Sequence, residues 1–181
     1  MNEKPIVDVL IKLLEFCTGA YNNSPMRLLK QVGALCVRSV EDGNPRVLLG
    51  TSRDTGRWII PKGWPLKKLD ERAAAEREAL EEAGVAGKIG KRAIGSFLYT
   101  KRLGCDDRLV LVSVFLLEVK KRKPRWLEQH ERQRAWFTAE TAAEMVLEPE
   151  LKALIRAFGR GECSHLEDRV HKALDASTAR L

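Results

Sequence analysis

The sequence of 181 residues lacks any long apolar run. No stretch approaches the roughly 20 apolar residues that a membrane-spanning helix needs, so we expect no membrane partner. The most apolar N-terminal stretch, residues 6–17, is interrupted by Asp8, Lys12 and Glu15 and has no basic leader, which argues against a secretory signal. These absences predict a soluble, cytoplasmic protein, and the length fits one compact domain with terminal additions.

Cysteine is scarce and scattered. The four cysteines, Cys17, Cys36, Cys105 and Cys163, form no CxxC pair, and no histidine stands at metal-finger spacing from them. A structural zinc site or a disulfide framework is therefore not expected, and the pattern predicts four reduced thiols. The sequence also has no internal repeat and no low-complexity segment.

Basic residues are in surplus. Lys and Arg number 32 against 25 Asp and Glu, which gives a formal net charge of +7 and a sequence pI near 9.4. Such a balance attracts phosphate-rich ligands, and nucleic acid is only one of these. Because the basic residues are spread along the chain, nucleic acid is a possible partner but not the favoured one. The basic run at residues 120–123 is interpreted as a solvated hairpin tip, with RNA or polyphosphate contact as the alternative.

Hydrophobic periodicity and turn signals predict strands that alternate with helices. An amphipathic helix is expected within residues 1–23, and a polar, partly helical tail begins near residue 160. Between them, strands are expected at 31–40, 46–51, 58–60, 94–99, 109–119 and 135–137, a rigid turn at 62–65, and helices at 71–83, 140–145 and 149–158. This order predicts an α/β fold with a mixed sheet and helices on its faces. Three regions follow: an N-terminal extension at 1–24, a domain at 25–158 and a C-terminal extension at 159–181.

The helix predicted at residues 71–83 carries an acidic face. At about 100° per residue, Glu78, Glu81 and Glu82 fall on one side of it. The opposite side, which we expect to contact the core, holds Leu69, Ala73, Leu80 and Ala83. Carboxylates at these spacings repel one another, and a bound Mg²⁺ would offset that cost because it takes several oxygen ligands. A solvated acidic helix face is the alternative interpretation.

The residues around this helix form a longer pattern. Gly63 is followed at fixed intervals by Arg77, Glu78, Glu81, Glu82, Gly84 and Val85, and this spacing resembles the Nudix box. Leu69 stands where the box has its first glutamate. The flanking segments 57–63 and 134–137 look like the diphosphoinositol polyphosphate and diadenosine polyphosphate hydrolase branch. The resemblance covers residues 28–158 and implies a Nudix α/β/α sandwich with terminal helical extensions.

The resemblance also implies an activity and a metal. Nudix hydrolases cleave a phosphoanhydride bond with water as the nucleophile. Carried over by motif position, Glu81 and Glu82 are expected to ligate Mg²⁺, with Mn²⁺ as a possible substitute. Glu78 is expected to be a third ligand or the general base, and the carbonyl of Gly63 a further ligand. Arg77 belongs to the same catalytic set; because Leu69 replaces its usual partner, we expect it to pair with Glu81 or Glu76.

Several residues outside the helix are candidates for substrate binding. Lys62 precedes the box glycine and is expected to meet a phosphate, with an ordinary turn lysine as the alternative. An electropositive rim is expected from Arg53, Arg57 and Arg134, each of which can also be a plain surface charge. Glu131, or Glu128 beside it, is a candidate for a further acidic residue from a loop.

The substrate expected from this resemblance is a small polyphosphorylated molecule, either a dinucleoside polyphosphate or a diphosphoinositol polyphosphate. Two alternatives stay open from the sequence. One is an RNA 5′-pyrophosphohydrolase, and the other is a non-catalytic Nudix-fold module that binds a ligand or RNA.

Overall fold

The computed structural model describes residues 28–38, 45–66, 69–104 and 106–162. The predicted helix in residues 1–24 lies outside the described residues, as does the tail from residue 163 onward. The elements, in chain order, are β1 (Leu29–Arg38), β2 (Arg46–Thr51), β3 (Trp58–Ile59), β4 (Lys62–Gly63), α2 (Glu71–Ala83), β5 (Val85–Leu103), β6 (Asp106–Arg122), β7 (Arg134–Thr138), α3 (Ala139–Met145) and α4 (Pro149–Gly159).

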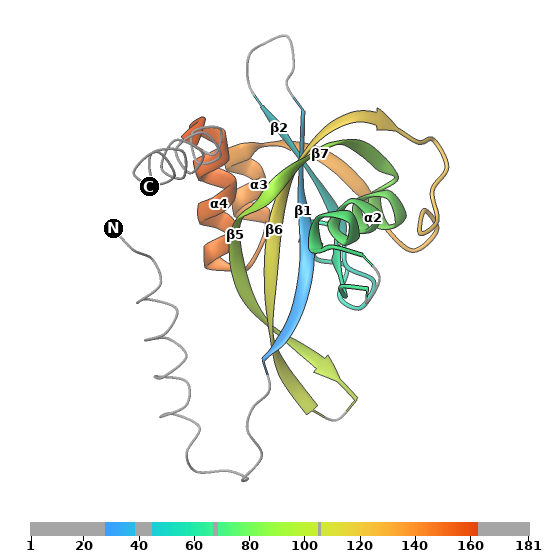
Figure 1. Ribbon diagram of the computed structural model, residues 1–181, viewed down its shortest axis with the longest axis vertical. Coiled ribbons are helices and arrows are strands. Elements are labelled where there is room, and N and C mark those ends of the chain that lie inside the picture. The colour runs from blue at the N-terminus through green and yellow to red at the C-terminus, as the bar shows by residue number, and fades with distance from the viewer. Residues whose placement is uncertain (1–27, 39–44, 67–68, 105, 163–181) are drawn as a thin grey trace, which may run out of the picture.

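The described strands form one mixed sheet, as the sequence predicted. Its main order is β3-β2-β1-β6-β5, with β4 paired to β1 and β7 paired to β2. β1 and β6 run parallel, whereas the other pairs are antiparallel. Helix α2 covers one face of the sheet, and α3 and α4 cover the other (Figure 1). The result is the α/β/α sandwich expected from the resemblance.

Two hydrophobic clusters lie on opposite faces of this sheet. One joins Val110, Val112 and Val114 of β6 to residues of α3 and α4 such as Leu151. The other joins Phe115 and Leu117, further along β6, to the alanines of α2. The Val- and Leu-rich β6 therefore contributes buried side chains to both faces of the sheet, as a central strand must. None of the helices in the described ranges is long and apolar enough to span a bilayer.

Two local predictions about strands and turns are wrong. Residues 62–65 were expected to form a rigid turn, but Lys62 and Gly63 form β4, which pairs with Gly33 and Val32 of β1. β5 is far longer than the predicted 94–99, because it begins directly after α2 and pairs with β6 from Val85 to Leu103, with register shifts between Ala86 and Gly95. The basic run at 120–123 consequently lies at the end of β6 opposite Val85, and not at the tip of the hairpin.

Helix α2 begins and ends where its capping residues predict. The side chain of Asp70 accepts a hydrogen bond from the backbone N–H of Ala73 at 2.6 Å, and Gly84 adopts φ 60° after the last turn. The expected core face is only partly correct. Leu69 is 41% exposed and Leu80 is half-buried, whereas the buried apolar residues of the helix are Ala74, Ala75, Ala79 and Ala83.

Candidate active site

Two of the three predicted glutamates are buried against the sheet. Glu78 and Glu82 lie one turn apart on α2 and are 7% and 9% exposed. The short alanine side chains of α2 pack against β1, and both carboxyl groups reach β4, at the backbone N–H of Lys62 and at Gly63. A solvated acidic face is therefore wrong for this pair. Glu81 points more outward, with its side chain one-third exposed.

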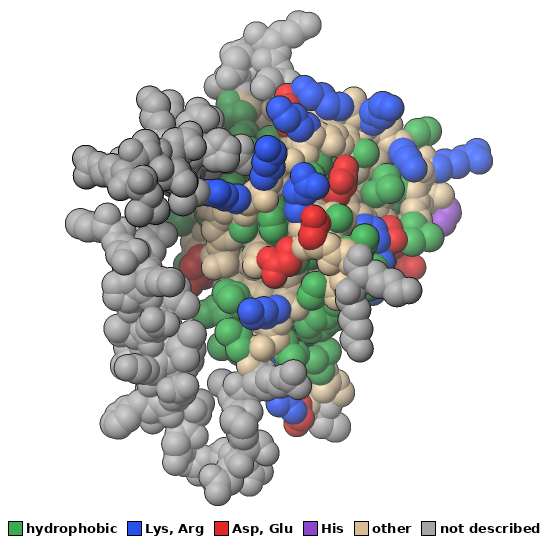
Figure 2. Space-filling view, in the orientation of Figure 1, with side chains coloured by type: hydrophobic (Ala, Val, Ile, Leu, Met, Phe, Trp, Pro, Cys, Tyr) green, Lys and Arg blue, Asp and Glu red, His purple; other side chains and the backbone are tan. Residues whose placement is uncertain are grey.

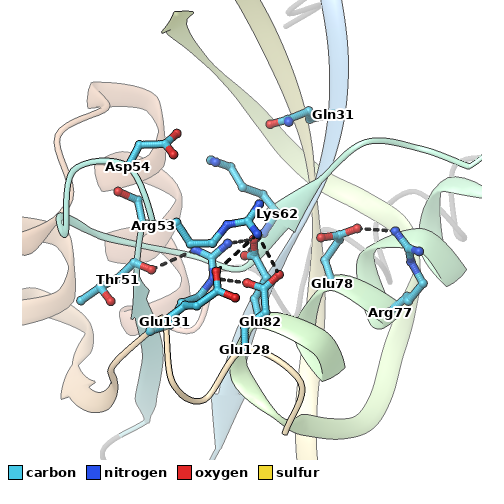
Figure 3. Close-up of polar contacts among 12 residues, drawn as sticks. Gln31, Thr51, Arg53, Asp54, Lys62, Arg77, Glu78, Glu82, Glu128 and Glu131 are labelled. Atoms are coloured by element: carbon cyan, nitrogen blue, oxygen red, sulfur yellow. Dashed lines mark hydrogen bonds and ion pairs between the residues drawn. The ribbon is translucent and has the colours of Figure 1, made fainter. Parts of the chain in front are cut away.

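Glu82 is held from two sides (Figure 3). One carboxylate oxygen accepts a hydrogen bond from the backbone N–H of Lys62 at 3.0 Å. The other accepts from the guanidinium of Arg132, which also contacts the carboxylate of Glu128 and donates to the carbonyl oxygen of Thr51 at 2.9 Å. Burial raises the pKa of Glu82 to about 7, although Arg132 acts in the opposite direction.

Glu78 faces the backbone of the short strand β4. A Cβ added at Gly63 would overlap the carboxylate of Glu78, so only glycine leaves room for it there. Arg77 donates to the same carboxylate at 2.7 Å and lies 3.8 Å from Glu81. Burial raises the pKa of Glu78 as well, with Arg77 opposing this effect. The arginine without its usual box partner thus reaches Glu78 in addition to the expected Glu81.

Lys62 extends its side chain away from the glutamates. Its ammonium lies 4.7 Å from the centre of the Tyr99 ring, and the Tyr99 hydroxyl donates to the side chain of Gln31 at 2.7 Å. Within the described residues, no carboxylate forms an ion pair with Lys62. Burial lowers its pKa to about 8; the charge of Glu82 opposes this shift, and the nearby cations Lys101 and Arg57 add to it.

The candidate rim residues fall into two groups. Arg53 lies beside the loop that precedes β7, 3.7 Å from Glu128 and 3.5 Å from Glu131, so both acidic candidates of that loop stand near the cluster. Arg57 pairs with buried Glu148 at 2.7 Å, in the neighbourhood of Lys62.

Arg134 lies apart from this cluster. The structure places its guanidinium at the C-terminal end of α2, where it donates to the carbonyl oxygens of Ala83 and Lys123. It also stacks 3.7 Å above the ring of Trp126. Its expected position on the rim is replaced by a role in joining α2 to the loop before β7.

Arg132 is the site residue that the sequence did not indicate. Its side chain is only 7% exposed and connects α2, β2 and the loop before β7. Its partners Glu82 and Thr51 are 50 and 81 positions away along the chain, so no local spacing marks it. The one available signal was the presence of a further arginine between two residues already singled out, Glu131 and Arg134.

The carboxylates of the candidate site are suitable ligands for a hard divalent cation. In the part of the chain that the structure describes, no three acidic, histidine or cysteine side chains stand together as a ready metal site. Glu78 and Glu82 are nevertheless buried carboxylates whose charged forms are disfavoured by desolvation, although Arg77 and Arg132 each pair with one of them. Oxygen donors of this kind suit Mg²⁺, and a cation beside them would stabilise both charges.

Comparisons with known proteins place the chain in a family. It matches the model of the NUDIX domain over residues 29–158. It is similar to diphosphoinositol polyphosphate phosphohydrolase 3-beta of Bos taurus, with 34% identity over 124 residues that cover 67% of this chain and 71% of that protein. The 3-alpha form of Mus musculus is 35% identical over the same shares.

Solved structures agree with the fold. A binary complex of the Ap4A hydrolase of C. elegans has a TM-score of 0.53 and 25% identity, over 72% of this chain and 95% of that one. The MutT protein of Methanosarcina mazei Go1 has a TM-score of 0.56 and 21% identity, over 77% of this chain and 98% of that one.

The match to the NUDIX domain and the phosphohydrolase relatives identify the chain as a phosphoanhydride hydrolase of Nudix type. The chain belongs to the NUDIX domain family, and the relatives found among curated proteins carry the branch name that the flanking segments suggested. The predicted family, fold and class of enzyme are confirmed.

Proposed function

We propose that the protein hydrolyses a phosphoanhydride bond of a small polyphosphorylated molecule in the cytoplasm, with Mg²⁺ as its cofactor and Mn²⁺ as a substitute. The candidate substrates are a dinucleoside polyphosphate and a diphosphoinositol polyphosphate, in line with the names of its relatives and of a structural neighbour. The observation that carries the proposal is the burial of Glu78 and Glu82 side by side beneath β4.

Glu78, Glu81 and Glu82, with the carbonyl of Gly63, are the residues proposed to hold the cation. When bound, such a cation neutralises charge on phosphate oxygens and lowers the pKa of water. The chain's own contribution is to fix the carboxylates: the Lys62 backbone N–H orients Glu82, and Arg77 orients Glu78. Burial raises the pKa of both carboxylates, which makes each of them a stronger base than an exposed glutamate.

The cations around the cluster are proposed to bind substrate phosphates. Lys62 is the leading candidate, because its ammonium lies over the Tyr99 ring and, among the described residues, is in no ion pair with a carboxylate. Arg57 and Arg53 flank it, each already near an acidic side chain. Glu131, which faces Arg53 and is exposed, is proposed as the further acidic residue from the loop.

The direct test is phosphate release by Glu82→Gln with and without Mg²⁺. Loss of one carboxylate that holds the cation removes several kcal/mol of charge stabilisation, so we expect turnover to fall about 10³-fold while the fold survives. Glu76→Gln is the matched control, because Glu76 lies on the same helix and makes none of these contacts. Unchanged release by Glu82→Gln would contradict the proposal.

The substrate is resolved by the same assay. Diadenosine tetraphosphate, a diphosphoinositol polyphosphate and 5′-triphosphate RNA are compared at equal concentration. Highest kcat/KM on one of the two small molecules supports the proposal, whereas highest kcat/KM on RNA favours the RNA 5′-pyrophosphohydrolase. Absence of metal-stimulated release on all three favours a Nudix-fold binding module.

A further inference from the structure

A groove lies on the outer side of α2, separate from the buried carboxylates. It is a shallow, open groove of about 400 Å³ between the C-terminal half of the helix and the loop after β6. Its lining, here named the Trp126 groove, consists of Leu80, Glu81, Lys123, Arg125, Trp126 and Leu127. Glu81 belongs to both the box and this groove, so the two sites share a wall.

The groove is positively charged at its rim. Lys123 and Arg125 are exposed and, among the described residues, neither forms an ion pair. They continue the basic run at the end of β6, and Figure 2 shows Lys and Arg side chains gathered over this part of the molecule. The one acidic group in the lining, Glu81, has the guanidinium of Arg77 3.8 Å away. The net field of the rim therefore favours an anion.

The interior of the groove is apolar and aromatic. The Trp126 indole is held in place because its N–H donates to the carbonyl oxygen of Glu82 at 3.2 Å and because Arg134 stacks on one face of the ring. Leu127 is 74% exposed, although a large aliphatic side chain gains free energy by leaving water. A rigid aromatic surface beside a free leucine suits a flat, weakly polar ring.

We propose that the Trp126 groove binds a nucleotide moiety, with the base against Trp126 and Leu127 and a phosphate at Lys123 and Arg125. The inference rests on the proposed function, since this nucleotide is the part of a substrate that extends beyond the bond cleaved at the carboxylates. An inositol polyphosphate carries phosphates around its ring and offers no face to an apolar lining. The groove therefore favours the dinucleoside polyphosphate among the two candidate substrates.

The test measures binding of ADP in the presence of EDTA, so that neither metal nor turnover is needed. The variant Lys123→Gln/Arg125→Gln removes both rim charges, and Lys121→Gln/Arg122→Gln removes one lysine and one arginine from the same exposed run outside the groove. We expect the first to raise the Kd for ADP about tenfold and the second to leave it within about twofold. Equal losses in both variants would overturn the proposal.

A second pair of variants tests the apolar part. Leu127→Ser is expected to weaken binding of ADP and adenosine several-fold while leaving that of inorganic pyrophosphate unchanged. Leu147→Ser is the control, because Leu147 is 65% exposed and lies outside the groove. Pyrophosphate that binds as tightly as ADP would overturn the assignment of a base.

The two failures are distinguishable. If wild-type protein hydrolyses diadenosine tetraphosphate but all four variants bind ADP as wild type does, the groove assignment is wrong and the proposed function stands. If the protein releases no phosphate from any substrate but the groove variants bind ADP more weakly as expected, the proposed function is wrong and the nucleotide site stands.

Discussion

The two faces of the sheet are packed in different ways. On the face under α3 and α4, α4 contributes the large aliphatic side chains Leu151 and Ile155, whereas the buried residues of the short helix α3 are alanines. The face under α2 is contacted by alanines, Ala74, Ala75, Ala79 and Ala83. Large side chains hold α4 at a distance and contribute burial, whereas alanines bring the backbone of α2 close to the sheet.

This difference in packing gives the two faces of the sheet different roles. A helix close to the sheet can bury carboxyl groups against the backbone of β4, which is where Glu78 and Glu82 end. Within α3 and α4 the glutamates Glu140 and Glu150 are exposed. The buried carboxylate on that side, Glu148, precedes α4 and is paired with Arg57. The face with less apolar volume is thus the one that positions the candidate active site.

Among the changes that test the difference between the two faces, the largest effect is expected where α2 meets β4. In Gly63→Ala the added methyl group overlaps the Glu78 carboxylate, which must move away because it is the end of a flexible side chain. Displacement of a catalytic group by about 1 Å costs about 10²-fold in rate, so we expect kcat to fall by that factor with little change in Tm.

Gly50→Ala is the control for this variant. Gly50 is also a strand glycine, but an added Cβ there meets only the carbonyl oxygen of Gln133 at 3.7 Å, an ordinary contact. Full activity in Gly50→Ala with a strong loss in Gly63→Ala supports the role of Glu78. Equal activity in both would show that the position of Glu78 does not matter.

A smaller effect is expected when the same type of substitution, alanine to leucine, is made on each face of the sheet. Ala79→Leu and Ala143→Leu each enlarge a fully buried alanine, the first under α2 and the second under α3. Overpacking costs about 1–3 kcal/mol in either place, so both should lower the free energy of unfolding. Only Ala79→Leu is expected to lower kcat, by about tenfold, because it lifts the glutamates from β4. A similar kcat loss in Ala143→Leu would remove the distinction between the faces.

The smallest effect concerns pH. Burial raises the pKa of Glu82 from 4.5 to about 7, so between these values the folded protein keeps a proton that the unfolded chain has released. The unfolded state then binds fewer protons, and the free energy of unfolding decreases as the pH rises. In EDTA we expect a loss of about 1 kcal/mol per pH unit between pH 5 and 7, measured by urea unfolding.

Two variants test whether Glu82 causes this pH dependence of the free energy of unfolding. Glu82→Gln cannot titrate and should lose most of the dependence, whereas Glu76→Gln should keep it. A slope that is the same in wild type and Glu82→Gln would place the titrating group elsewhere.

The sequence predicted the box helix well because its signals are local. Asp70, Gly84 and the helical spacing of the glutamates depend on neighbours within a few residues, and all three agree with the structure. The buried face of α2 was harder to predict, since leucine normally indicates the core. Here Leu69 and Leu80 are not fully buried, because the close contact with the sheet requires small side chains instead.

Contacts between distant segments could not be predicted in this way. Arg132 reaches Glu82 only because the loop before β7 passes beside α2, and the pairing of β7 with β2 fixes that path. Lys62 and Gly63 were expected in a turn, since Pro61 and Pro65 flank them, yet pairing with β1 makes them a strand. Both outcomes depend on topology that a single sequence does not encode locally.

The central claim is that the buried pair Glu78 and Glu82 holds a divalent cation. The most direct measurement is Mn²⁺ binding followed by electron paramagnetic resonance of the free ion, on wild type, Glu82→Gln and Glu76→Gln. We predict that Glu82→Gln weakens Mn²⁺ affinity at least about tenfold while Glu76→Gln binds as wild type does. Wild-type affinity in Glu82→Gln would contradict the account.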